Sequence, residues 1–427
     1  MNKKTKSILD EYNDEITELD VSNKNIKGIL NLSKFKKLYK LNCSNNNITK
    51  IIVIKNLTDI NCSHNKIVKV SDKLFFSSQN NILTNPIEEI EYPFDINMGL
   101  FGNTVKKIIF NYSFNDQVDN LPNELKILVF SNKFNKTVDN LPNCLKEIYF
   151  GYDFNQFVDN LPASLELIVF GLLFDNTIDN LPSGIKEIKF NDLYLYHDGE
   201  ESKFNKNINS LPYNLEKIIL PNNFNSTILN FPPNLKYLDF GKSYNQPINN
   251  LSNSLKVLIF NEKFNNFINN LPPELIHLTI KNKSFDINNI KTFFPDSLTN
   301  LYISSNIFEL INLENIQNVK NIKIYNFNDT IYNNHKFTKH KILDKLKNSY
   351  FTDIVLDYNN FSTPNLNYIL QDMPDSIQSL KIIYDKHNYR IKTSNIPYGL
   401  KKFEINGIIY NQNKLKKIKQ EKFYKFN

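Results

Sequence analysis

Apolar and polar positions alternate in short segments that recur along most of the chain. Each segment has the form L-x-x-L-x-F, as in Leu125, Leu128 and Phe130, and apolar residues at alternate positions indicate a β-strand with one buried face. An aromatic residue precedes each segment, and these anchors recur at a constant spacing at Phe114, Phe134, Phe154 and Phe174. The pattern therefore predicts one strand in every repeat.

The spacing is interrupted once and then restored. An insertion moves the next anchor, and the series continues at Phe204, Phe224, Tyr244, Phe264 and, one position late, Phe285. Each strong copy also contains D-N-L-P or a close variant, and its proline cannot donate a ladder hydrogen bond and holds the preceding residue extended. Because a turn this short has no room for a strand and a full crossover helix, we expect irregular or 3-10 return segments between parallel strands.

The strand pattern continues, less regularly, on both sides of the strong copies. The earliest copies are followed by asparagines typical of leucine-rich-repeat turns, Asn46 and Asn65. The sequence thus predicts an α/β-type leucine-rich-repeat solenoid of about 18 turns with a parallel β-sheet on one face. The expected organisation is an N-terminal cap over 1–15, leucine-rich turns over 16–93, strong repeats over 94–290 with an insertion loop at 191–203, degenerate turns over 291–405, and a basic cap or tail over 406–427.

Each turn offers a ring of apolar side chains that it cannot bury alone. One such ring consists of Phe134, Val138, Leu141, Leu145, Ile148 and Phe150. Stacking buries the rings, and each large side chain contributes about 1.5–3 kcal/mol. Two polar columns accompany them, headed by Asn115 and Asn120, and the favoured interpretation is that these short side chains satisfy backbone groups in the turns. A ladder that binds a ligand is the alternative.

The repeat F-N-x-x-[IV]-[DN]-N-L-P-x-x-L-K-x-[IL]-x-F resembles the FNIP repeat, a relative of the leucine-rich repeat found in social amoebae and in giant viruses that infect amoebae. The resemblance is close over residues 94–290 and general over 16–67 and 298–405. It implies a solenoid that binds proteins. Several FNIP proteins carry an N-terminal F-box that hands targets to a ubiquitin ligase, but the stretch before Ile16 is too short for a three-helix F-box.

The residues between the inward-facing ones on the strands should form a continuous surface that faces solvent. Over four turns of the strong repeats one column of this surface is apolar, and residues of the adjoining column extend it. Exposed apolar stripes on soluble proteins mark partner surfaces, so we expect a protein to bind at Ile109, Ile127, Val129, Tyr149, Leu167 and Val169. The alternative is that β-branched and aromatic residues are here simply because they favour strands.

The insertion at 191–203 interrupts the repeat after a strand and must leave the solenoid as a loop. It carries two aromatic residues, Tyr194 and Tyr196, ahead of an acidic run. We therefore include Tyr194 and Tyr196 among the candidate partner-binding residues. A neutral insertion that the fold tolerates is the alternative interpretation.

The charge distribution argues against a nucleic-acid or membrane surface. The formal net charge is +7, yet residues 94–290 carry 17 lysines against 21 acidic residues, and the chain has a single arginine, Arg390. Phosphate recognition needs a positive stripe and favours arginine. The lysine-rich end at 413–427 is interpreted as a solvated end or helical cap, with a nuclear-import or nucleic-acid segment as the alternative. A short helix is expected over 339–350, because Ile342, Leu343 and Leu346 share one face.

Enzyme chemistry finds little support in the sequence. The six histidines show no metal-ligand spacing, and the cysteines of the first turns, Cys43 and Cys62, occupy inward strand positions typical of small core residues. Gly99 and Gly102 do not form a phosphate-binding loop. We therefore expect no catalytic residues, no cofactor and no metal.

The remaining signals bear on location and function. Three cysteines are too few for a disulfide framework, and no signal peptide or membrane span is seen, which favours the cytoplasm, of the host cell if the chain is viral. We expect a non-catalytic scaffold that binds another protein, a host protein in the viral case, and no membrane. The alternatives are a substrate receptor linked to a ubiquitin ligase and nucleic-acid contact through the basic ends.

Overall fold

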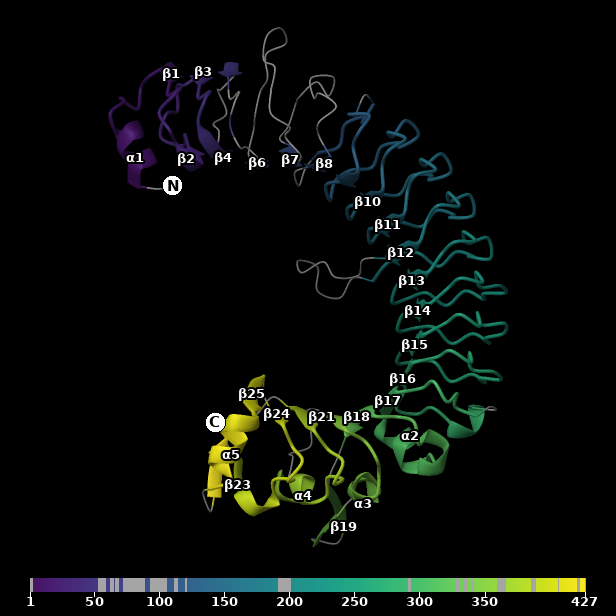
Figure 1. The fold of residues 1–427 in the computed structure, drawn as a ribbon. Helices are drawn as coiled ribbons and strands as arrows, with labels where there is room; N and C mark the ends of the chain where they lie inside the picture. Colours follow the sequence, from purple (N-terminus) through teal and green to yellow (C-terminus); the bar gives the residue numbers. More distant parts are fainter. Residues whose placement is uncertain are drawn as a thin grey trace. The chain divides into compact units, whose positions relative to one another are not determined.

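The structure is a computed structural model, and it divides into two compact units that are described separately, unit 1 (residues 1–215) and unit 2 (residues 216–427) (Figure 1). The residues that it describes are 3–52, 59–61, 65, 69–71, 89–92, 106–110, 114–119, 121–190, 201–290, 293–327, 330–333, 336–339, 341–358, 366–384, 389–405, 407–420 and 423–426.

Unit 1 consists of a short helix followed by parallel strands. Helix α1 (Lys3–Asp10) comes first, and Leu9 on it is buried. The strands are β1 (Glu18–Asp20), β2 (Lys27–Asn31), β3 (Lys40–Asn42), β4 (Asn47–Ile52), β5 (Asp59–Asn61), β6 (Lys69–Ser71), β7 (Glu89–Tyr92), β8 (Lys107–Phe110), β9 (Ile127–Val129), β10 (Glu147–Tyr149), β11 (Leu167–Phe170) and β12 (Glu187–Phe190). Strands β1, β3 and β5 form one parallel sheet, and the long parallel sheet has the order β2-β4-β6-β7-β8-β9-β10-β11-β12.

The first turns differ from the expected single sheet. The strands predicted from the L-x-x-L pattern (β1, β3 and β5) pair with one another, whereas the long sheet continues through the second strands of these turns. The turn asparagine explains this arrangement, because Asn46 Nδ2 donates to the carbonyl of Cys43 at 2.9 Å and Asn46 Oδ1 accepts from the amide of Ile26 at 2.8 Å. One turn later, Asn65 Nδ2 donates to the carbonyl of Cys43 in the preceding turn at 2.8 Å, and Asn65 Oδ1 accepts from the amide of Ile48 at 2.9 Å. The predicted leucine-rich-repeat turns are confirmed, and each leads into a second strand.

Unit 2 continues the one-strand-per-turn pattern and adds helices to its later turns. Its parallel sheet runs β13 (Lys217–Ile219), β14 (Tyr237–Asp239), β15 (Val257–Phe260), β16 (His277–Ile280), β17 (Asn300–Ser304), β18 (Asn321–Phe327), β21 (Asp353–Tyr358), β22 (Ser379–Ile383) and β24 (Lys402–Ile405). Antiparallel pairs are β24 with β25 (Ile408–Asn411), β19 (Thr330–Asn333) with β20 (Lys336–Lys339), and β23 (Tyr389–Lys392) with β26 (Phe423–Phe426).

The return segments are mostly irregular, as expected. Short helices occur at η2 (Ile287–Asn289), α2 (Ser305–Leu310), η3 (Leu313–Ile316), α3 (Lys341–Lys347), α4 (Leu366–Gln371), η4 (Thr393–Asn395) and α5 (Gln412–Ile418). Helix α3 confirms the helix expected over 339–350, and its Ile342, Leu343 and Leu346 are buried. The described residues form about 14 turns rather than about 18, since several expected strand and return positions, Cys62 and Val105 among them, lie outside the described ranges.

The basic end of the chain contains a short helix that packs on the last strands of unit 2. Helix α5 buries Leu415 and Ile418 and lies beside β24 and β25. Lys419 Nζ donates to the carbonyl of Pro397 at 3.0 Å, and Lys414 Nζ lies 4.3 Å from the ring centre of Tyr410. These contacts place part of the lysine-rich segment in a helical cap on the last strands of unit 2.

Two ladders of stacked aromatic rings fill the strong repeats. In unit 1, the F-N phenylalanines stack on those of adjacent turns with ring centres 6.0–6.1 Å apart, and the strand-end phenylalanines stack at 5.1–5.9 Å. The two ladders touch each other, for example at Phe150 and Phe154, whose ring centres are 3.7 Å apart. Unit 2 repeats the arrangement through Phe224, Tyr244 and Phe264. Offset stacking of this kind adds to the burial of the rings.

The asparagine column beside the rings is structural. Side-chain carbonyls of this column accept from the backbone amide of the same position one turn later, as Asn115 does from Asn135 at 2.8 Å and Asn135 from Asn155 at 3.0 Å. In the second polar column, Asn140 Nδ2 donates to Asp119 Oδ1 at 3.1 Å, and later copies repeat this bond. Hydrogen bonds that join neighbouring turns confirm the structural interpretation of both columns.

Removal of one rung of this column should weaken the stack. In unit 2, Asn245 Oδ1 accepts from the amide of Asn265 at 2.8 Å. We expect Asn245→Ala to lower the free energy of unfolding by about 1–3 kcal/mol, because the amide loses its acceptor. Asn245→Asp keeps an acceptor and is the control, since Asp175 occupies this column naturally. Urea unfolding followed by circular dichroism measures both, and equal losses for the two variants would contradict the assignment.

The tyrosine in the aromatic ladder, Tyr244, has a buried hydroxyl that destabilises the fold. Tyr244 is 1% exposed, and its hydroxyl has no hydrogen-bond partner among the described residues. We expect Tyr244→Phe to raise the free energy of unfolding by about 1 kcal/mol, because a buried unsatisfied hydroxyl is lost while the stack is kept. Phe264→Tyr, the reverse change one turn later, should lower it. A fall in thermal stability for Tyr244→Phe would show that the hydroxyl is satisfied.

Candidate functional site

The candidate site of unit 1 is the outward face of the sheet formed by β8 to β12. Strand pairing places two columns on this face. The second column contains Ile109, Val129, Tyr149, Val169 and Lys189, and the first column contains Lys107, Ile127, Glu147, Leu167 and Glu187. The predicted residues Ile109, Val129, Tyr149 and Val169 are therefore brought together on adjacent strands.

The structure modifies this predicted patch in two ways. Val169 is only 8% exposed, because it lies in register between the longer side chains of Tyr149 and Lys189. The prediction that Val169 is exposed on this face is therefore wrong. The other predicted residues of β8 to β11 are half-buried. In the adjoining column, Glu147 lies in register between Ile127 and Leu167, so a carboxylate interrupts the predicted extension of the patch.

Tyr149 is the largest side chain of the unit 1 patch. Its hydroxyl donates to Glu147 Oε2 at 2.8 Å. Burial of the ring, followed by the hydrogen bond to Glu147 and the negative charges of Glu147 and Glu187, raises the pKa of Tyr149 to about 12. The tyrosine is therefore neutral at physiological pH, and the patch presents an aromatic ring beside a carboxylate.

The other two candidate residues, Tyr194 and Tyr196 of the insertion, lie outside the described residues.

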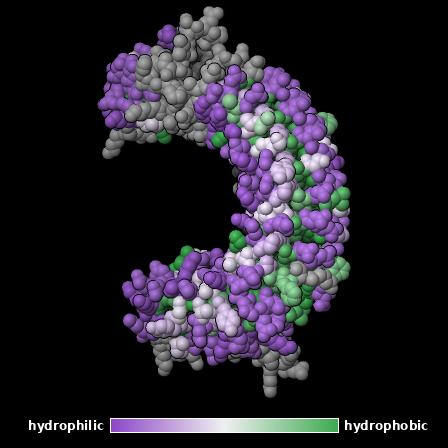
Figure 2. All heavy atoms as spheres, turned by 45° about the vertical axis from the view of Figure 1, so that its right-hand side comes forward, coloured by the Kyte–Doolittle hydropathy of each residue, from purple (hydrophilic) through white to green (hydrophobic). Residues whose placement is uncertain are grey.

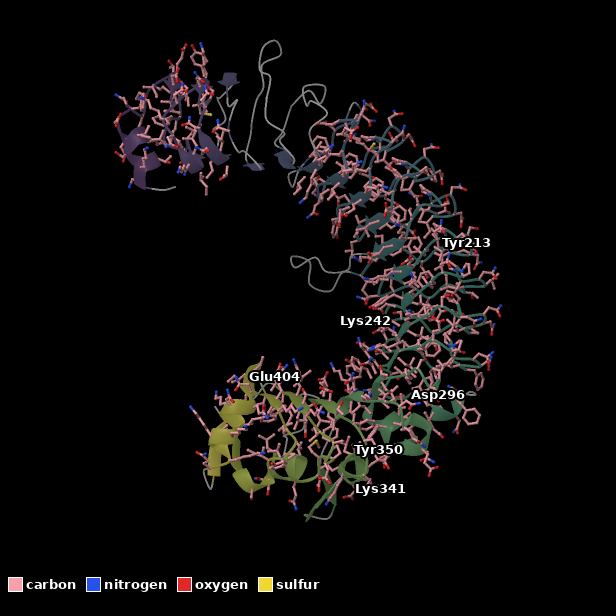
Figure 3. The ribbon with its side chains drawn as sticks, viewed as in Figure 1. Tyr213, Lys242, Asp296, Lys341, Tyr350 and Glu404 are labelled. Carbon is pink, nitrogen blue, oxygen red and sulfur yellow. The ribbon has the colours of Figure 1, made fainter. Side chains whose placement is uncertain are left out.

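The outward face of unit 2 is more polar than that of unit 1. Its second column contains Ile219, Asp239, Ile259, Thr279, Tyr302, Lys323, Val355, Lys381 and Glu404. Figure 2 shows hydrophilic and hydrophobic side chains interleaved over the turns. In Figure 3, Lys242 lies on the side of unit 2 that bears strands β13 to β16, and Asp296 lies on the side of the return segments. The face therefore mixes charged, aromatic and aliphatic groups.

Asp239 on β14 is an acid with a strongly perturbed pKa on this face. It lies in register between Ile219 and Ile259, and Asn261 Nδ2 donates to Asp239 Oδ1 at 2.9 Å. Burial raises the pKa of Asp239 to about 6 from its ordinary 3.8, while the hydrogen bond from Asn261 and the positive charge of Lys281 act in the opposite direction. Within the described part of the chain no cation lies within ion-pair distance of this carboxylate.

A second polar group lies further along the same face. Lys323 Nζ pairs with Asp357 Oδ2 at 3.0 Å and lies 4.4 Å from the ring centre of Tyr325. Burial raises the pKa of Tyr325 above its ordinary value, with smaller contributions from nearby negative groups. Lys281 Nζ lies 5.9 Å from the ring centre of Tyr325. This group is a satisfied network, in contrast to Asp239.

His277 is a further titratable group on this part of the face. Its Nε2 lies 2.8 Å from Thr279 Oγ1, and its ring meets that of Tyr302 edge to face with centres 4.5 Å apart. Burial lowers the pKa of His277, so the ring is neutral at pH 7. The sequence predicts no ligand role for this histidine, and its contacts in the structure are with a hydroxyl and an aromatic ring.

Asp239 and its surroundings were not identified from the sequence. A signal was present, because the turns on either side place isoleucine where Asp239 stands. An acidic residue between two isoleucines of a repeat column is unusual, but its burial depends on side chains of the neighbouring strands. No residue pattern of the chain shows how closely those side chains approach it.

The described residues hold little else that suggests a ligand site. No helix among them is long and apolar enough to cross a membrane. The same residues contain no group of three or more metal-ligating side chains. A hollow of about 420 Å³ lies between two successive turns of unit 2, and asparagines line most of it, including Asn249, Asn250, Asn269 and Asn270. Its lining residues carry no charge.

Parallel strands that recur at a constant spacing, with asparagine turns and short irregular returns, define a leucine-rich-repeat-like solenoid. A search of solved structures supports this fold through CroV588, described as a novel circular leucine-rich-repeat protein, with a TM-score of 0.52 and 22% identity over 91% of this chain and 69% of that one. YopM from Yersinia enterocolitica is a more distant match, with a TM-score of 0.27 and 14% identity over 95% of this chain and 92% of that one. A search of curated protein sequences finds no match.

The repeat itself is recognised at the sequence level. The family model of the FNIP repeat matches residues 134–173 and 224–262. The chain therefore contains FNIP repeats and has a leucine-rich-repeat-like fold, as the sequence indicated. Repeat folds of this type are in general non-enzymatic scaffolds for protein interaction.

The burial of Asp239 predicts a stability difference that depends on pH. Because its pKa is raised in the folded protein, the folded state loses stability as pH rises from about 4 to about 6, and the full cost, about 3 kcal/mol, applies above that range. We expect Asp239→Asn to be more stable than wild type at pH 7.5 and to lose this advantage near pH 4. Urea unfolding at several pH values measures the difference, and a constant offset between the variants would contradict the assignment.

Proposed function

We propose that the chain is a non-catalytic scaffold that binds another protein through the outward strand face. The observation that carries the proposal is the register of β8 to β11, which aligns Ile109, Val129 and Tyr149 on adjacent strands of one half-buried face. Apolar and aromatic groups aligned on a regular surface suit the core of a protein interface. The partner class, a protein, is the one that repeat folds of this type generally bind.

The cytoplasmic location expected from the sequence is part of this proposal. Its support is chemical, because Cys144 is a free thiol in the described part of the chain. A reducing compartment preserves such thiols. The partner would then be a protein of that compartment.

Site-specific crosslinking tests the binding face directly. A photoreactive benzoylphenylalanine at position 129, in place of Val129 on β9, should crosslink a defined protein in the cells that express the chain. The matched control places the same group at exposed Thr137, in a return segment of the same repeat. Ile127→Glu should abolish the crosslink from position 129, since it adds an unpaired charge to the contact surface. Equal labelling from both positions would contradict the proposed face.

A further inference from the structure

Asp239 departs from the pattern of its own column. The neighbouring strands place Ile219 and Ile259 directly beside it, and the same column of unit 1 includes Val129 and Val169. An aspartate therefore occupies a place where its immediate neighbours present aliphatic side chains. The change does not help the fold, because a carboxylate is harder to desolvate than an aliphatic side chain.

The carboxylate of Asp239 is half-buried and has no ion-pair partner among the described residues. Within the described residues, its Oδ1 accepts a hydrogen bond from Asn261. Other acids of the chain show what a satisfied carboxylate looks like: Glu166 pairs with Lys146 at 2.7 Å and with Lys186 at 2.8 Å, and Asp357 pairs with Lys323 at 3.0 Å. Asp239 has no comparable cation in the described part of the chain, although Lys281 is near enough to influence it electrostatically.

The chemistry of these surroundings selects one kind of occupant. The isoleucines on either side can pack along the methylene stem of a lysine or arginine, whose charged head then reaches the carboxylate. An anionic group is repelled. An apolar side chain would desolvate Asp239 further without a compensating charge.

We propose that Asp239 is the position at which unit 2 recognises a lysine or arginine side chain of a bound protein, flanked by Ile219 and Ile259. This inference rests on the proposed function, because it assumes that a protein lies on the outward strand face. It adds the chemistry of one contact to that function. In the complex, an ion pair with the bound lysine or arginine would offset the desolvation cost that Asp239 has in the free protein.

The other titratable and charged groups around Asp239 bear on the pH dependence of this contact. They are Lys217 on β13, Tyr237 on β14, His277 on β16, Lys281 after β16 and Tyr325 on β18. Burial raises the pKa of Asp239 to about 6 and lowers the pKa of His277, and a variant at Asp239 separates the effects of these two groups.

Peptide selection tests the inference without knowledge of the natural partner. Phage-displayed random dodecapeptides are selected at pH 7.5 on the full chain and, in parallel, on Asp239→Asn. Peptides from the wild-type selection should be enriched in lysine or arginine and should bind wild type at least tenfold more tightly than Asp239→Asn. Glu216→Gln is the matched control, because it removes a negative charge from an exposed pair with Lys236, and it should leave binding unchanged.

The pH profile distinguishes an ion pair from a general effect of charge. Binding to wild type should fall at least fivefold as pH drops from 7.5 to 5, and binding to Asp239→Asn should stay constant, since only the wild type loses its carboxylate charge. Pools without basic residues, peptides that bind both proteins equally, or a selection that yields no binders would overturn the inference. Peptides that are lost with Ile259→Glu but not with Asp239→Asn would overturn it and leave the proposed function standing. Peptides indifferent to both variants would also overturn it, and the crosslink from position 129 would then decide the proposed function separately.

Discussion

The structure depends on the register with which one turn is stacked on the next. Parallel pairing aligns each strand residue with its equivalent in the following turn, as Ile148 is aligned with Ile168. Equivalent side chains of successive turns therefore lie next to each other. Phenylalanine stacks on phenylalanine, and the side-chain carbonyl of an asparagine accepts from the backbone amide of the asparagine one turn later. The close approach leaves little tolerance, since a Cβ at Gly171 would lie 1.8 Å from the carbonyl oxygen of Gly151. No turn is stable alone, and the surface properties follow from this stacking.

The same register that builds the core also composes the outward face. Every substitution at an outward strand position changes one element of a two-column array without disturbing the inward rings, because successive strand residues point to opposite faces. Unit 1 uses these positions for aliphatic and aromatic side chains around Tyr149, and unit 2 uses them for charged and aromatic groups around Asp239 and Tyr325. A repeat fold can in this way vary its binding chemistry while its packing stays constant.

Much of the fold could be predicted from the sequence, because a repeat period and an alternation of apolar residues report local constraints. The strands at Ile127, Glu147 and Leu167, the helix at Lys341 and the structural asparagine columns were all found in this way. The division of the first turns into two strand ladders was not predicted. Asn46 and Asn65 could be recognised as turn residues, but the strands that follow them and pair with one another could not be recognised. Pairing partners in these turns depend on contacts between segments, which no single segment encodes.

For the candidate site, the sequence by itself determined which residues occupy outward positions and that the column from Ile109 to Val169 is apolar. Only the tertiary structure decided how exposed they are, because burial on a sheet face depends on the length of the side chains on adjacent strands: Val169 is covered between Tyr149 and Lys189. Asp239 could not be identified from the sequence for the same reason. The sequence shows that an acidic residue stands at this position, but its desolvation is caused by Ile219, Ile259 and the neighbouring strands and exists only when those turns are stacked.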